Sequence, residues 1–244
     1  FFFDPSFEVV KMAGRALRGE ISAMTPAEKK AATRVTLSFL KSRPVRDSRA
    51  ATNSTLIYLG YLAHTDAIPA LLGYTSVDRF RSTRRHALGS LRNTLLGETV
   101  PARVMETIFP YLDDPDFESV VAPTLAILEK ASLPTGYERE LRRLVGGRYP
   151  QVRQFAVRKL ASSRTKTSAE ALLDVMEGKH EELRRSAVRA LKNSPQAPSL
   201  LRPRLLTEKD PDRAWALVHL VKPHADSLKP ARVPDWIKTK LEMD

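Results

Sequence analysis

The sequence predicts an all-α fold, a right-handed α-solenoid in which helical hairpins stack one on another. Three observations predict it. A segment of about twelve residues recurs along the chain. Apolar residues within each copy are spaced as on one face of a helix, and turns rich in glycine, proline or aspartate precede the copies. An alternating strand pattern nowhere extends beyond a few residues. With 42% hydrophobic residues, the chain can build a continuous core.

The recurring segment aligns without gaps in the copies 114–125, 149–160, 180–191 and 210–221. A fifth and less regular copy is 80–91, in which Thr83 takes the position of Phe117, Val152 and Leu183. From Thr83 onward the register recurs after 34, 35, 31 and 30 residues. Periods of this length are typical of solenoids in which each unit is one helical hairpin.

One face of each segment is apolar. Val152, Ala156 and Leu160 are spaced i, i+4 and i+8, and residues 183, 187 and 191 repeat this spacing. The middle residue is alanine in both copies, so a neighbouring helix can approach closely. Each recurring segment forms the second helix of its hairpin, and a first helix is expected before the turn. The helical spacing of apolar residues places these first helices at 100–112, 136–145, 168–176 and 200–206.

The turns carry helix-start signals. Asp114-Pro115 predicts a helix that has the aspartate as its cap and proline at its first position. Pro123 and Pro203 fall inside helical patterns, so we expect a kink or a local break at each. Glycine is scarce, with 10 residues, and is expected at helix ends.

The first third of the chain is less regular. Residues 7–17 read as a helix, and Thr25-Pro26 with Glu28 forms a capping box that begins a helix over 27–40. Residues 47–62 and 66–72 are expected to form one further hairpin. We therefore predict a single solenoid domain over 1–244, with its clearest repeats at 78–222 and less regular helices at 1–77. Because the chain begins at Phe1 without methionine, a fragment of a longer or processed chain is expected.

Aspartate-proline-aspartate followed by Val-Arg-x-x-Ala-x-x-x-Leu resembles the HEAT-repeat consensus, within the wider HEAT and armadillo-like solenoids. The match is best at residues 152–160 and 183–191. The resemblance implies that Arg84, Arg153 and Arg184 pair with an acidic residue of the preceding turn and form a ladder, which Glu118 and Ala214 interrupt. It says little of function, because this scaffold has many unrelated roles.

Catalytic, cofactor and metal sites are not expected. The chain has no cysteine, and no two of its five histidines are spaced i, i+4 on a helix. Asp113, Asp114 and Asp116 are better explained by helix capping than by a cation site. Asp212 and Trp215 do not match any motif of the HEAT-like DNA glycosylases. No segment is apolar enough over about 20 residues to span a membrane.

Basic residues concentrate in one stretch. Residues 139–204 hold 16 Lys and Arg against 6 Asp and Glu, whereas the remainder holds 24 against 22, and the net charge is +12. In a HEAT stack the second helices line the concave side, so basic residues aligned on them would face one partner. The residues predicted to contact a partner are Arg153, Arg158, Arg184, Arg185, Arg189 and Lys192.

These observations predict a non-enzymatic scaffold that presents a basic surface for protein–protein interaction, with an acidic protein surface as its partner. The alternative is a nucleic-acid-binding or DNA-repair HEAT-like protein, although the basic stretch holds few aromatic residues for base stacking. A small-molecule ligand is not expected. The sequence leaves the compartment open, with a slight preference for the cytoplasm.

Overall fold

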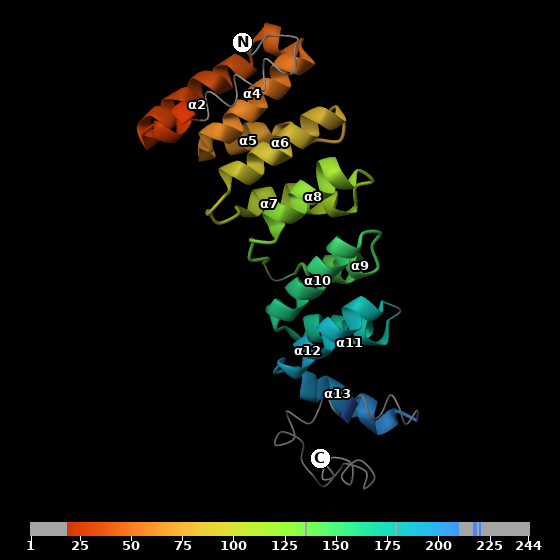
Figure 1. Ribbon diagram of the computed structural model, residues 1–244. Coiled ribbons are helices and arrows are strands. Elements are labelled where there is room, and N and C mark those ends of the chain that lie inside the picture. Colours follow the sequence, from red (N-terminus) through yellow and green to blue (C-terminus); the bar gives the residue numbers. More distant parts are fainter. Residues whose placement is uncertain (1–18, 135, 179, 210–216, 219, 221–244) are drawn as a thin grey trace. The chain divides into compact units, whose positions relative to one another are not determined.

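The computed structural model describes residues 19–134, 136–178, 180–209, 217–218 and 220. The chain divides into two compact units, Phe1–Ser132 and Leu133–Asp244. Every regular element in the described ranges is helical (Figure 1), which confirms the all-α class. None of the described helices combines the length and the apolar character needed to cross a membrane. The single domain over 1–244 stays a prediction, and the expected helix over 7–17 lies outside the described residues.

The first unit contains short helices and helical turns joined by tight connections. Its elements are α2 (Pro26–Leu40), α3 (Arg43–Arg46), α4 (Arg49–Leu62), η1 (Thr65–Ala67), α5 (Ile68–Gly73), α6 (Arg81–Thr94), α7 (Ala102–Ile108), η2 (Phe109–Asp113), η3 (Phe117–Val121) and α8 (Ala122–Leu128). The capping box is confirmed: the Glu28 backbone N–H donates to Thr25 Oγ1 at 3.3 Å, and the Thr25 backbone N–H donates to Glu28 Oε2 at 2.7 Å.

Helices in this unit pair differently from the expectation. The sequence predicted one hairpin from residues 47–62 and 66–72, but α4 packs against α2, and α5 packs against α6. Helix α4 also packs closely along α6. It therefore has the place of a second helix in its own repeat, because second helices of neighbouring repeats lie side by side.

The turn before η3 differs from the expectation in its capping residue. Asp116, and not Asp114, caps the following helical segment, since its Oδ1 accepts the Ser119 N–H at 3.1 Å. Pro123 produces the expected local break: residues 117–121 are π-helical, and the α-helix begins only at Ala122. A proline has no N–H for an α-helical bond, so the preceding turn takes another pattern.

The second unit is a regular stack of hairpins. Its elements are α9 (Glu138–Val145), α10 (Pro150–Ser163), α11 (Lys166–Glu177), α12 (Glu181–Lys192) and α13 (Ala197–Thr207). Helix α9 packs on α10, α11 packs on α12, and α10 packs on α12, so both hairpins stack through their second helices (Figure 1). Helix α13 continues through Pro203, so the chain has no break there, and the kink that was the other expectation stays a prediction.

The predicted apolar faces form the core of the second unit. Val152, Ala156 and Leu160 on α10 are at most 1% exposed, and so are the corresponding residues 183, 187 and 191 on α12. Phe155, which the repeat alignment did not assign to the core, is also fully buried. The i, i+4, i+8 register is thus confirmed for both second helices.

Arg84 and Arg153, each near the start of a second helix, join two repeats in a way that corrects the expected ladder, whereas Arg184 pairs with Glu181 of its own helix. Arg84 Nε donates to the carbonyl of Thr75 in its own preceding turn at 3.0 Å. Its Nη2 lies 2.8 Å from Asp114 Oδ2, which belongs to the turn of the following repeat. Arg153 similarly donates to the carbonyl of Gly147 at 3.1 Å and to Glu182 of the next second helix at 3.0 Å. The acid therefore comes from the following repeat, and the preceding turn supplies a carbonyl.

Gly60 and Gly89 lie inside helices, where the sequence placed glycines at helix ends. Gly60 on α4 meets Ser90 on α6: a Cβ at Gly60 would lie 2.5 Å from Ser90 Oγ and 2.7 Å from its Cα. Ser90 Oγ donates to the carbonyl of Leu56 at 2.7 Å. The two helices cross here at backbone distance, and only glycine fits. Gly89, one residue earlier on α6, has no atom within 4 Å of its ideal Cβ position.

We expect Gly60→Ala to destabilise the protein, because the clash involves the Ser90 backbone, and overpacking costs about 1–3 kcal/mol. The matched Gly89→Ala should stabilise it by roughly 0.5–1 kcal/mol, since alanine is the better helix former and has open space. Urea denaturation followed by circular dichroism measures both. Two changes of the same sign would contradict this helix crossing.

Arg84→Met should lower the free energy of unfolding by about 3–5 kcal/mol, because it leaves the Asp114 carboxylate, which is only 10% exposed, without its guanidinium and the Thr75 carbonyl without its donor. The control is Arg103→Met on the exposed surface of α7, for which we expect a change within about 0.5 kcal/mol. Equal losses in the two variants would show that Arg84 does not join the repeats.

Candidate functional site

A basic groove lies between the second helices of the second unit. Helix α10 and its C-terminal cap contribute Arg158 and Arg164, and α12 contributes Arg189. The hollow has a volume of about 570 Å³. Buried Val157 and Leu183 and the small Ala161 and Ala190 line it beside the arginines. An apolar surface bordered by exposed guanidinium groups can bind an extended chain that carries both carboxylates and apolar side chains.

Arg164 enters the groove through an uncommon backbone conformation. It caps α10 in the left-handed region, with φ 53° and ψ 15°. A non-glycine residue rarely adopts this conformation. The chain turns here directly into α11, whose cap is Thr165, and Thr165 Oγ1 accepts the Ser168 N–H at 3.1 Å. The end of α10 thereby places a cation at the edge of the groove.

The six residues predicted to contact a partner fall into three groups. Arg158 and Arg189 line the groove together. Arg185 and Lys192 are exposed on α12 but are not among the lining residues. Arg153 and Arg184 bind within the chain: Arg184 donates to the carbonyl of Gly178 at 3.1 Å and pairs with Glu181 at 2.9 Å, and Arg153 joins two repeats as described above. That these two also contact a partner stays a prediction.

The groove contains one acidic residue with a fixed charge. Hydrogen bonds from its own backbone N–H and from Arg153 hold the pKa of Glu182 below its ordinary value of 4.5. Glu182 is therefore ionised at neutral pH and is engaged by Arg153. Its carboxylate offsets part of the charge of Arg153, while Arg158, Arg164 and Arg189 remain exposed.

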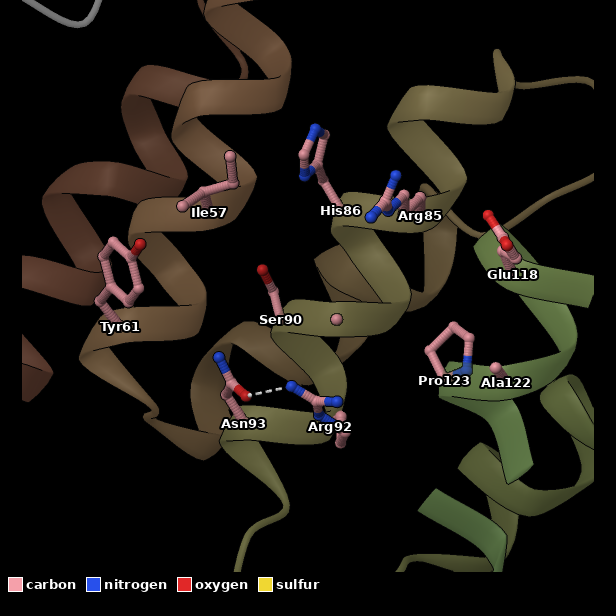
Figure 2. Close-up of a pocket in the computed structure, with 11 residues that line it drawn as sticks. Ile57, Tyr61, Arg85, His86, Ser90, Arg92, Asn93, Glu118, Ala122 and Pro123 are labelled. Atoms are coloured by element: carbon pink, nitrogen blue, oxygen red, sulfur yellow. Dashed lines mark hydrogen bonds between the residues drawn. The ribbon is translucent and has the colours of Figure 1, made fainter. Parts of the chain in front are cut away.

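An equivalent groove in the first unit was missed by the sequence analysis (Figure 2). Helix α6 lies between α4, which carries Ile57 and Tyr61, and the segment of η3 and α8 that carries Glu118 and Pro123. The hollow measures about 660 Å³. The basic residues that line it are Arg85, His86 and Arg92.

The repeat alignment itself contained the signal for this second groove. Arg85 and Arg92 occupy the positions of Gln154 and Ala161 on α10, which line the groove of the second unit. Charge density along the sequence does not reveal these two arginines, because residues outside 139–204 are nearly balanced in charge, although Arg85 and Arg92 share a helix face. Both Arg85 and Arg92 are exposed.

The Asp114–Asp116 cluster and the Ser90 hydroxyl are engaged in the fold. Asp114 Oδ1 accepts the Asp116 N–H at 2.9 Å, and Asp116 Oδ1 accepts from Arg81 at 2.9 Å, so this cluster serves capping and ion pairing. Ser90 Oγ donates to a backbone carbonyl. In the described part of the chain, no three His, Asp or Glu side chains gather as a metal site would require. Asp212 and Trp215 lie outside the described residues.

His86 gives the groove of the first unit a titratable group. Burial lowers the pKa of His86 below its ordinary value of 6.5, and the positive charge of Arg85 lowers it further. The imidazole is thus neutral at pH 7. Because the unfolded chain binds this proton more tightly, the contribution of His86 favours unfolding as the pH falls through about 6.5.

We expect the His86 ring protons to titrate below pH 6.5 in a nuclear magnetic resonance pH series. Arg85→Gln should raise this pKa only in part, because burial is the larger cause. A titration at or above 6.5 in the parent protein would contradict the burial of the ring.

Comparison with known proteins gives a family match that lies within the second unit. The model of the HEAT-repeat family matches residues 139–221. No curated protein matches the sequence. HEAT repeats commonly act as protein-interaction scaffolds and are generally not enzymes. The match includes both stacked hairpins of the second unit, in agreement with the helix pairing there. Residues 139–221 of this chain are therefore similar to the HEAT-repeat family.

Proposed function

We propose that this protein is a non-enzymatic scaffold whose basic groove between α10 and α12 binds an acidic segment of a partner protein. The observation that carries the proposal is the placement of Arg158, Arg164 and Arg189 around one hollow with an apolar floor. A segment of alternating acidic and apolar residues would complement both parts of this surface.

Electrostatics supports an acidic partner. Three guanidinium groups around one hollow repel one another, and the stacking of helices does not require this arrangement. Coulomb attraction to carboxylates would offset the repulsion and would speed association. The apolar floor adds affinity because an apolar side chain that enters it leaves water. Arg185 and Lys192 extend the positive surface along the exposed face of α12.

Nucleic acid is the alternative partner, favoured by the net charge of +12. The lining of the groove weighs against it. The residues known to line the hollow include no aromatic side chain on which a base could stack. A charged phosphate backbone would also gain nothing from contact with the apolar floor of the groove.

The experiment compares a synthetic peptide of alternating glutamate and leucine with a short DNA duplex as ligands of the full chain. Arg158→Glu with Arg189→Glu should weaken peptide binding by roughly 100-fold, because each reversal replaces an attraction by a repulsion worth about a factor of ten. It should also flatten the dependence of affinity on salt. Fluorescence anisotropy measures both quantities.

A matched control reverses two exposed arginines elsewhere in the same unit, Arg139 and Arg148, with the same change of net charge. This control should bind the peptide nearly as the parent protein does. If it loses affinity equally, net charge and not the groove is responsible. If the duplex binds more tightly than the peptide and the groove variant alone loses it, the nucleic-acid alternative is correct.

A further inference from the structure

We propose that the first unit carries a separate site for a phosphorylated side chain of a protein segment. The site is a pocket of about 550 Å³ between the α3–α4 junction and the turn that precedes α6. Residues that line it are Arg46, Asp47, Arg49, Thr52, Tyr74, Arg79, Phe80 and Thr83. It is independent of the groove between α10 and α12, which belongs to the other unit.

Three arginines give this pocket a positive charge that the nearby aspartates offset only in part. Arg46 and Arg49 are exposed, and in the described part of the chain neither forms an ion pair. Asp47, the acidic residue of the lining, is 3.4 Å from Arg43 and is thereby engaged. Arg79 is held only loosely, with its Nε 3.9 Å from Asp78. A dianion could therefore contact three cations here, and the nearby carboxylates would compete with it only weakly.

Stacking orients two of these cations. The guanidinium of Arg49 lies over the Phe80 ring at 4.9 Å, and that of Arg79 lies over the Tyr74 ring at 5.2 Å. Stacking occupies the face of a guanidinium and leaves the N–H groups at its edge free to donate. Less side-chain freedom is then lost when the edge binds two oxygens at once. This fork geometry suits a phosphoryl group.

The surroundings of the pocket favour a protein segment as the source of the phosphoryl group. Phe80 is 64% exposed and Val77 is 74% exposed, so two large apolar side chains stand in water beside the arginines. They would pack against apolar residues that flank a phosphorylated residue. Arg49 is also the first residue of α4, and the positive end of the helix dipole adds to the local potential.

The test uses the full chain and three ten-residue peptides that differ only at a central position, which is phosphoserine, serine or glutamate, with leucine on both sides. Calorimetry should give an affinity for the phosphoserine peptide at least about tenfold above that for the serine peptide. Arg49→Gln should remove about a factor of ten, whereas Arg103→Gln on α7 should leave the affinity unchanged. Unchanged melting curves for both variants would show that folding is retained.

The dependence on pH separates phosphate from carboxylate. The second pKa of a phosphoserine is about 6, so the dianion predominates at pH 7.5 but not at pH 5.5. Arginine side chains in proteins stay charged over this range, and no histidine is among the residues described in the lining. Affinity for the phosphoserine peptide should therefore fall on acidification, and affinity for the glutamate peptide should not.

Three outcomes would overturn the proposal. The first is equal binding of the phosphoserine and serine peptides. The second is equal loss in Arg49→Gln and Arg103→Gln, which would indicate attraction to net charge alone. The third is inorganic phosphate or a DNA duplex bound as tightly as the phosphoserine peptide, because the protein segment would then contribute nothing. The double variant at Arg158 and Arg189 should keep phosphopeptide binding, so failure here is distinguishable from failure of the proposed function.

Discussion

The register of the stacked repeats depends on Arg84 and Arg153, each near the start of a second helix. A helical hairpin cannot bury its apolar face alone, so it needs a neighbour in a fixed register. Arg84 and Arg153 set this register, since each binds a carbonyl of its own turn and a carboxylate of the next repeat. Apolar contacts alone would tolerate sliding along the helix axis. These ion pairs do not, because a shift would leave the largely buried guanidinium of Arg84 or Arg153 without its carboxylate.

The close packing of neighbouring second helices determines where grooves form on the surface. Alanine at 156 and 187 and glycine at 60 let second helices approach each other, and the side chains that point away from the contact border shallow grooves. The grooves recur at equivalent positions, between α10 and α12 in the second unit and beside α6 in the first. The repeat that builds the core thus also repeats a place for binding.

Arginine has two different roles in this protein, and burial separates them. The side chains of Arg84 and Arg153 are 10% and 12% exposed and belong to the fold. Those around the grooves and the pocket near Phe80 stand in water, where a surface charge contributes little to stability. Their concentration on particular faces is the reason to assign them to binding. The same residue type therefore supports stability at one position and recognition at a position a few residues away.

The sequence by itself determined the all-α class, the repeat register, the buried faces of α10 and α12 and the capping box of α2, because these follow from spacing along one chain. Only the tertiary structure decided which turn supplies the acid for each arginine, that α4 pairs with α2, and that Gly60 meets Ser90. It also brought Arg158 beside Arg189, and Arg49 onto Phe80. These contacts join residues about 30 positions apart, and local periodicity carries no information on how one repeat is rotated against the next.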